Sequence, residues 1–437
     1  MNNWVNEKLL PPVMKFVGSR PIKALRDGML YTMPFIIVGS IFLILAQFPE
    51  PHVASWMKST GLTPYWNVAY NATFSVMAFV AVIGIAYSWV KAEGFTPLPA
   101  GILAGISFLL VMQPITPVTV GGKVVATAKQ MVHSSYIDRN WMGGQGMVTA
   151  IIVGMVTGLI YTWFMKKDIR IKLPEQVPEN VSASFTALIP AAVLITGWLI
   201  VYIIFDKLIG NSMTAFIYGL IQLPLQGLTD SFGGTLVLAL LIPFLWFFGV
   251  HGSVIVGGIL GPLLTANALA NQKILDSGQT LTVANGGHIV TQQLLDQFMT
   301  VTGAGMTIGL VVFMTFFAKS RQWKDLGKLA IGPALFNINE PILFAAPIVM
   351  NPILAIPFFA TPLLSAILTY FALFFGLIPL FPATIVPWTT PPIISGFLIG
   401  GWRAAAWQLL MLVMTFFIYL PFARKQDALN VAMETKG

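Results

Sequence analysis

The residues best suited to chemistry in this sequence lie within otherwise apolar stretches. Glu340 follows Asn337 and Asn339 in LFNINEPILFAAP, residues 335–347, where the other residues are aliphatic, aromatic or proline. A carboxylate accepts hydrogen bonds and can take a proton, and asparagine amides both donate and accept. Such a set in a dry pocket suits a polyhydroxylated ligand. The structural alternative is a carboxylate that accepts from backbone N–H groups freed at the break before Pro341.

A second candidate is His251, which lies between Gly249 and Gly252 in FLWFFGVHGSVIVGG. Glycine on both sides allows a helix break or a close approach of two backbones. The alternative is a histidine that is satisfied by a helical carbonyl. Trp246 precedes it by five residues and offers an indole face for the apolar side of a sugar ring. Aromatic residues at membrane depth are more often packing or interface anchors, so both interpretations stay open.

Two further polar groups complete the set of candidates. Trp388, Thr389 and Thr390 place a ring and two hydroxyls in the proline-rich stretch FPATIVPWTTPPIISG. Asn140 follows Arg139 in YIDRNWMGGQG, where a solvated loop is the default interpretation. No Walker loop, dinucleotide-binding glycine motif, zincin helix or nucleophile elbow is present. Energy for any uphill step must therefore come from an ion gradient or a partner protein.

The composition places these residues in a membrane protein. The chain has 437 residues, of which 56% are hydrophobic and 9% charged, against roughly a quarter charged in soluble domains. It contains no cysteine, which excludes disulfides, thiolate metal sites and cysteine nucleophiles on this chain. Its four histidines are widely scattered, so we expect no metal cluster. The net charge of +8 is better explained by basic cytoplasmic loops than by nucleic acid.

The apolar runs predict an all-α polytopic membrane protein, since about 20 apolar residues span the hydrocarbon core. No signal peptide is evident, and residues 1–28 either lie on the inner membrane face or form a solvated lead-in. Two apolar stretches, 329–351 and 377–400, are interrupted by proline, glycine and polar residues. The predicted spans are 29–48, 68–90, 97–116, 145–165, 186–205, 231–250, 251–270, 301–319, 352–376 and 404–422.

The distribution of Lys and Arg predicts that both termini are cytoplasmic. With the N-terminus inside, 17 of the 24 Lys and Arg residues lie on inner segments and 7 on outer ones. This assignment of inner and outer segments is consistent only if 329–351 and 377–400 each enter and leave the membrane on the same side. Non-helical backbone at that depth is tolerated only where protein buries it or where it lines a cavity. We therefore expect two re-entrant hairpins at the binding site.

At this point several stretches match a known family. The chain resembles the membrane-embedded IIC component of bacterial sugar phosphotransferase systems (PTS), in the lactose/cellobiose/diacetylchitobiose branch. The resemblance covers essentially the whole chain, and the stretch around Asn-Glu-Pro is its most specific part. The matching stretches are GGQGMVTAIIVG (143–154), IRIKLPEQVPENVSASFTALIPA (169–191), FFGVHGS (247–253), GPALFNINEPILFAAPIVMNP (332–352) and VPWTTPPIISGFL (386–398).

The resemblance implies a homodimer in the bacterial cytoplasmic membrane, with ten membrane helices per subunit and two re-entrant hairpins. Residues 29–210 would form the half that makes the dimer contact, and 211–424 the half that carries the sugar. Residues 1–28 and 425–437 would be cytoplasmic segments.

The resemblance also implies the activity. Such permeases bind a disaccharide outside and present the 6-hydroxyl of its non-reducing sugar to phosphorylated IIB, with IIA, HPr and enzyme I upstream. The donor is a cysteine thiolate on IIB, so this cysteine-free chain would be part of a phosphotransferase complex without carrying the phosphoryl group itself, and no cofactor is implied. No motif distinguishes diacetylchitobiose, cellobiose and lactose, and we expect a β-linked disaccharide, diacetylchitobiose or cellobiose. The basic segments 166–172 and 319–328 either dock IIB or only set the topology.

Site roles follow from the same resemblance. Glu340 and His251 are the pair implied near the 6-hydroxyl, with Glu340 the better candidate for the base. Asn339 is implied to bind the same sugar. Other substrate contacts are implied at Trp246, Trp388, Thr389 and, as a weaker candidate, Asn140.

Two other classes of function remain open from the residues alone. A secondary transporter would couple sugar to H⁺ or Na⁺ with Glu340 as the coupling group, since broken midplane helices suit that class equally. A passive channel or receptor would accumulate nothing.

Overall fold

The computed structural model describes residues 11–12, 15, 18–112, 118–120, 123–126, 137, 139–174, 176–346, 348 and 351–435. Most of the N-terminal segment 1–17, and half of residues 117–144 between the predicted spans 97–116 and 145–165, lie outside these described residues. The chain divides into two compact units. Unit 1 comprises Met1–Ile36, Asn71–Gln226 and Gly257–Ala266, and unit 2 comprises Ile37–Tyr70, Gly227–Val256 and Asn267–Gly437.

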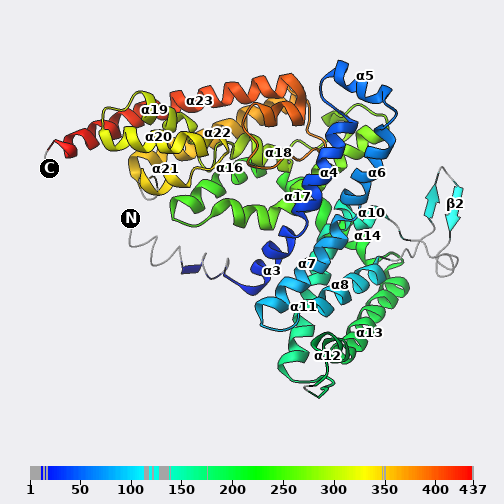
Figure 1. Cartoon of the computed structure of the whole chain (residues 1–437). Helices are drawn as coiled ribbons and strands as arrows, with labels where there is room; N and C mark the ends of the chain where they lie inside the picture. The colour runs from blue at the N-terminus through cyan, green and yellow to red at the C-terminus, as the bar shows by residue number, and fades with distance from the viewer. Residues whose placement is uncertain are drawn as a thin grey trace. The chain divides into compact units, whose positions relative to one another are not determined.

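The first half of the chain is mainly helical (Figure 1). A short antiparallel hairpin of β1 (Val118–Val120) and β2 (Lys123–Ala126) departs from the all-helical expectation. The helices are α3 (Arg20–Leu30), α4 (Met33–Ala46), α5 (Pro51–Ser59), α6 (Thr63–Phe74), α7 (Met77–Ala92), α8 (Leu98–Val111), α10 (Arg139–Met142), η2 (Gly144–Gly146), α11 (Met147–Lys166), α12 (Glu179–Thr186), α13 (Leu188–Ile204), η3 (Phe205–Ile209), α14 (Met213–Ile217) and η4 (Tyr218–Gln222).

The second half contains several short helices and three long ones, α17, α22 and α23. The helices are α15 (Leu223–Thr229), α16 (Phe232–Phe247), α17 (Gly252–Asp276), η5 (Val283–Asn285), α18 (Gln292–Leu294), η6 (Leu295–Met299), α19 (Ile308–Phe316), α20 (Arg321–Leu335), α21 (Glu340–Ala345), α22 (Pro352–Phe374) and α23 (Ile394–Glu434). The last helix is kinked at Gly400 and Gly401, whose dihedral angles are not helical.

Unit 1 is organised around α7, whose small and β-branched residues let neighbouring helices approach closely. Ala78, Ala81 and Val82 of this helix are completely buried. A Cβ atom at Gly28 of α3 would lie 2.5 Å from the Cα atom of Ile85, so only glycine fits this crossing. The core of unit 1 therefore depends on backbone-to-backbone packing, which is common between membrane helices.

Seven helices in the described part of the chain are long and apolar enough to cross a membrane. They correspond to seven predicted spans, namely 29–48, 68–90, 145–165, 186–205, 251–270, 352–376 and 404–422. The predicted span 97–116 corresponds to the shorter apolar helix α8, and 231–250 to α16, which belongs to a pair of helices bent by 74°.

The predicted span 301–319 is not one continuous helix. Its helix begins only at Ile308, because the chain before it forms turns. Thr302 and Met306 there adopt positive φ values of 63° and 50°, and Gly303 and Gly305 lie between them with 90° and 76°. Left-handed backbone costs a non-glycine residue energy, so tertiary contacts must hold these turns in place.

Candidate functional site

Two non-helical segments of unit 2 meet at the side chain of Asn337. One segment joins α20 to α21, and the other, residues 375–393, joins α22 to α23. Asn337 has a left-handed φ of 64° and is 6% exposed. Its Nδ2 donates to the carbonyl oxygens of Trp388 and, at 3.0 Å, Thr390, while its Oδ1 accepts from the backbone N–H of Thr302 at 2.6 Å. One amide thus ties the Asn-Glu-Pro stretch to the Trp-Thr-Thr stretch.

The backbone of segment 375–393 is bound by side chains instead of by a helix. Asn271 Nδ2 donates to the carbonyl of Phe381 at 2.9 Å, and Gln293 Nε2 donates to that of Thr384 at 2.9 Å. Ser40 Oγ accepts from the N–H of Ile385 at 3.1 Å. Non-helical backbone needs such partners where water is excluded. The broken character predicted for 377–400 is therefore present up to Ile393, the residue before α23.

Further along, Gln408 of α23 binds the start of its own helix. Its Oε1 accepts from the N–H groups of Ile393 and Gly396, and its Nε2 donates to the carbonyl of Gln297 at 2.8 Å. Sequence reasoning missed both Gln408 and Gln293. Gln408 is an uncharged amide in an apolar run, and the available signal was that an amide at membrane depth must find hydrogen-bond partners. Gln293 lies in a polar stretch between two predicted spans, where nothing distinguishes it.

Glu340 is the first residue of α21, and its carboxylate faces His251. Its Oε1 lies 3.9 Å from Nε2 of His251, and the two side chains are 42% and 49% exposed respectively. Its Oε2 is buried and has no hydrogen-bond partner among the described residues. Within the described part of the chain, Oε2 therefore accepts no hydrogen bond from the freed backbone N–H groups that the structural alternative invoked.

His251 caps the N-terminus of α17 through its ring. The N–H of Val254 donates to Nδ1 at 3.4 Å, so Nδ1 is the acceptor and the ring proton of the neutral imidazole is on Nε2. That N–H faces the Glu340 carboxylate. Gly252 permits this arrangement, because a Cβ there would lie 2.4 Å from the carbonyl oxygen of Ile242. The close backbone approach expected beside His251 is present.

Trp246 lies behind the histidine and is only 4% exposed. Its ring centroid is 4.3 Å from that of His251 at an interplanar angle of 47°, and 6.2 Å from that of Phe344. Its Nε1 donates to Ser253 Oγ at 3.5 Å. In this structure the indole packs against the imidazole and fixes where it lies.

The remaining predicted residues differ in how accessible they are. Asn339 is 3% exposed, and its Nδ2 donates to the carbonyl of Ala304 at 2.7 Å and to Thr307 Oγ1 at 2.9 Å. It therefore supports the turns before α19. Trp388 is 48% exposed and Thr389 is half-buried. These residues belong to unit 2, whereas Asn140 belongs to unit 1, where it is exposed on α10.

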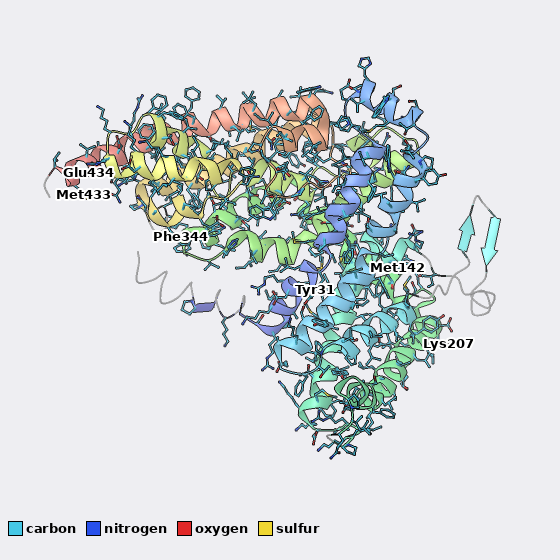
Figure 2. The ribbon with its side chains drawn as sticks, in the orientation of Figure 1. Tyr31, Met142, Lys207, Phe344, Met433 and Glu434 are labelled. Atoms are coloured by element: carbon cyan, nitrogen blue, oxygen red, sulfur yellow. The ribbon has the colours of Figure 1, made fainter. Side chains whose placement is uncertain are left out.

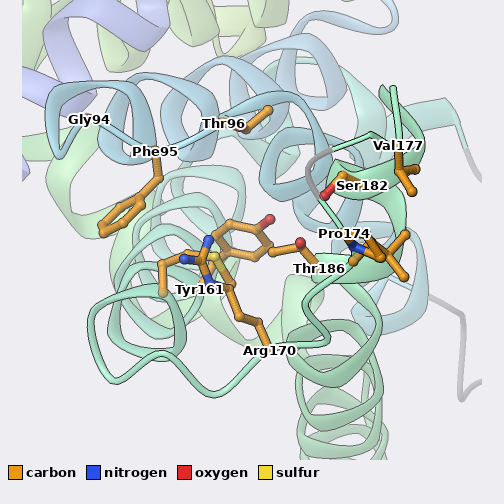
Figure 3. Close-up of a pocket in the computed structure, with 11 residues that line it drawn as sticks. Gly94, Phe95, Thr96, Tyr161, Arg170, Pro174, Val177, Ser182 and Thr186 are labelled. Atoms are coloured by element: carbon orange, nitrogen blue, oxygen red, sulfur yellow. The ribbon is translucent and has the colours of Figure 1, made fainter. Parts of the chain in front are cut away.

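A separate cavity lies within unit 1 and contains none of the predicted site residues. It has a volume of about 560 Å³ and is lined by residues of the loop after α7, the end of α11 and the stretch from Arg170 to Thr186. Figure 3 shows Tyr161 and Arg170 beside each other in its wall. Arg170 Nε donates to Asp168 at 2.8 Å, so this guanidinium is already paired. All of its lining residues belong to unit 1, whereas the Glu340–His251 pair belongs to unit 2.

Comparisons with known proteins point to one family. The family model "Phosphotransferase system, EIIC" matches residues 26–362. The lichenan permease IIC component of Bacillus subtilis (strain 168) is 39% identical over 98% of this chain and 94% of its own length. The cellobiose-specific EIIC component of the PTS of Geobacillus stearothermophilus is 36% identical over 98% and 95%.

A solved structure is similar over nearly all of both chains. The crystal structure of ChbC, the IIC component from the N,N'-diacetylchitobiose-specific phosphotransferase system, has a TM-score of 0.91 and 35% sequence identity, and the match covers 99% of each chain. The family match covers more than half of this chain, and two relatives exceed 30% identity over almost all of it. The chain therefore belongs to the EIIC family, the integral membrane sugar permeases of the phosphotransferase system.

Proposed function

We propose that this permease carries a β-linked disaccharide across the bacterial cytoplasmic membrane and presents the sugar's 6-hydroxyl to phosphorylated IIB. The observation that carries the proposal is the accessible Glu340–His251 pair beside two broken segments. Relatives named for cellobiose and for diacetylchitobiose support these two disaccharides as substrates. Membership of the EIIC family favours group translocation over ion-coupled transport.

The geometry of the pair suggests how a hydroxyl binds. The 3.9 Å between Glu340 Oε1 and His251 Nε2 is too long for a direct hydrogen bond. A hydroxyl oxygen about 2.8 Å from each atom bridges that gap, because it donates to the carboxylate and accepts from the imidazole N–H. His251 already carries a proton on Nε2, so Glu340 is the group that can accept one.

The chemical step then needs no covalent help from this chain. The 6-hydroxyl oxygen attacks phosphorus in line, a new O–P bond forms, and the S–P bond of the phosphocysteine on IIB breaks. The thiolate leaves with the bonding electron pair, and Glu340 takes the hydroxyl proton. Positioning supplies most of the acceleration in such transfers. A positioned general base contributes about 10²- to 10⁴-fold.

The other predicted residues either contact the sugar or support the site in this proposal. Trp388 is accessible and offers a ring to the sugar, and Thr389 lies next to it. Trp246 and Asn339 are buried, so we assign them positions behind the site, where they hold His251 and the turns before α19. Asn140 remains the weaker predicted contact.

The membrane arrangement is part of the same proposal. Ten spans, two re-entrant hairpins and cytoplasmic termini are supported by the excess of Lys and Arg on the inner segments. A homodimer whose contact lies in 29–210, with sugar carried by 211–424, completes it.

The test is Glu340→Gln and His251→Gln in membrane vesicles, each assayed for disaccharide binding and for phosphorylation by phosphorylated IIB. We expect Glu340→Gln to bind sugar and to phosphorylate it about 10²-fold or more slowly. Glu50→Gln is the control, since it changes a carboxylate that caps α5 and is remote in sequence from Glu340. Normal phosphorylation by Glu340→Gln contradicts the base role. Free sugar accumulated in a gradient that an uncoupler collapses identifies ion-coupled transport instead.

A further inference from the structure

Helix α20 exposes one basic face and buries the other. Trp323, Gly327, Ala330 and Ala334 recur at intervals of four, three and four and are buried, as in an amphipathic helix. Arg321, Lys324 and Lys328 occupy the other side and are exposed. Leu329 next to them is 76% exposed. We call the set Arg321, Lys324, Lys328 and Leu329 the α20 face.

The buried side fixes α20 firmly against its neighbours. A Cβ at Gly327 would lie 2.6 Å from the backbone N of Thr315, so α19 and α20 touch backbone to backbone. Figure 1 shows α19 and α20 side by side next to α23. The position of the α20 face is thus set by packing, without help from a partner.

Carboxylates from the end of α23 occupy the N-terminus of α20. Asp427 accepts from the N–H groups of Lys319 and Ser320 at 2.9 and 3.0 Å. Glu434, at the C-terminal end of α23 (Figure 2), accepts from Ser320 Oγ at 2.6 Å and from the N–H of Arg321 at 3.1 Å. The protein itself therefore satisfies this helix N-terminus. An incoming anion meets the side-chain cations instead.

The charges distinguish this face from the other basic segment, 166–172. There Lys166 binds Glu93 at 2.5 Å, and both Arg170 and Lys172 pair with Asp168. On the α20 face Lys328 has a 3.7 Å contact with Asp325, but Lys324 has no ion-pair partner among the described residues. Lys167 of the segment 166–172 also has no ion-pair partner among the described residues, but it follows the last residue of α11, whereas Lys324 lies within a helix that packing holds in place.

The α20 face also leads directly to the Glu340 site. The helix ends at Leu335, and Glu340 begins α21 five residues later. At 1.5 Å per residue the first turn of α20 lies about 20 Å from that end. A protein interface of ordinary size, about 800 Å² per partner, is roughly 30 Å across. One partner can therefore cover the α20 face while it delivers a group to Glu340.

We propose that the α20 face is the docking surface for phosphorylated IIB, whose negatively charged phosphocysteine Lys324 and Lys328 attract. The inference rests on the proposed function and on α20 being cytoplasmic. Charges at the rim of an interface mainly change the association rate and its salt dependence. Reversal of these charges therefore acts on the encounter with IIB, and leaves sugar binding unchanged.

The experiment measures the KM for phosphorylated IIB in sugar phosphorylation, with Lys324→Glu/Lys328→Glu against the wild type. We expect a rise of about tenfold at low ionic strength that shrinks as salt is added, because screening shortens the reach of the charges to about 10 Å at 0.1 M. Lys167→Glu is the control. It reverses an exposed cation of the segment 166–172, and we expect a change of less than about twofold.

The outcomes separate the docking surface from the proposed function. Failure of the wild type to phosphorylate sugar with phosphorylated IIB overturns the proposed function itself. With an active wild type, a KM within about twofold of normal in the double variant, or an equal rise in Lys167→Glu, overturns the docking surface. Should the double variant fail to bind sugar, Lys324→Ala/Lys328→Ala replaces it, with an expected rise of about threefold and the same criteria.

Discussion

Replacement of Asn337 by Asp tests whether one amide holds the site together. Aspartate has nearly the same shape and tolerates the left-handed backbone found at this position. It keeps the acceptor for the N–H of Thr302 but loses the NH₂ group that donates to Trp388 and Thr390. Two carbonyl oxygens then face a buried carboxylate oxygen, and the two broken segments lose their direct link.

The expected loss follows from those two hydrogen bonds. Each buried acceptor that loses its donor costs about 1–3 kcal/mol. The two acceptors together therefore predict a decrease of about 2–6 kcal/mol in the stability of this region. Because the displaced segment carries Trp388, we also expect the affinity for the disaccharide to fall at least tenfold, which corresponds to about 1.4 kcal/mol.

The assay is isothermal titration of the disaccharide into the purified protein, together with its thermal unfolding. Asn285→Asp is the matched control, since Asn285 makes a comparable donation to the carbonyl of Thr280 at 2.8 Å but is exposed. We expect little change there. A protonated aspartic acid regains one O–H donor, so the deficit of Asn337→Asp shrinks at acidic pH. Wild-type affinity and unfolding temperature in Asn337→Asp would refute the reasoning.

Two further predictions concern packing and pH. Gly327→Ala forces a contact between α19 and α20, and we expect it to destabilise the protein by about 1–3 kcal/mol. The Cβ of Gly332→Ala on the same helix meets no atom within 4 Å, so we expect this variant to stabilise the protein by about 1 kcal/mol. Thermal unfolding of both variants checks the difference. Hydrogen bonds from Lys172 and then Arg170 lower the pKa of Asp168 below 3.8. Its contribution to stability is therefore present above that value and lost as pH falls, and unfolding curves of Asp168→Asn lack this acid-dependent step.

The sequence predicted the broken character of the site better than its internal contacts. The number of membrane crossings that keeps both termini inside, together with the positions of the prolines, located the two interrupted stretches. The structure has non-helical backbone at 336–339 and 375–393. The contacts between them join residues more than 50 positions apart through one asparagine. No local pattern specifies which of several polar side chains makes such a long-range contact.

The turns before α19 are a second feature that the sequence did not predict. The apolar run 301–319 reads as a continuous span, yet Thr302 is left-handed and its N–H is bound by Asn337. Tertiary hydrogen bonds override helix propensity there. Likewise, composition does not reveal that Trp246 and Asn339 are buried while Trp388 is exposed, because burial depends on how distant helices pack.

The polar residues of the Asn-Glu-Pro stretch divide into two kinds once their partners are known. Asn337 and Asn339 direct their amides to backbone and hydroxyl groups of the protein, and both are buried. Among the described residues Glu340 has no such partner on Oε2, and its Oε1 lies 3.9 Å from Nε2 of His251. An unsatisfied carboxylate is costly in an apolar setting unless a ligand completes its hydrogen bonds. Both asparagine amides are already engaged by the protein, so we predict that Glu340, through Oε1, is the group of this stretch that a sugar hydroxyl contacts.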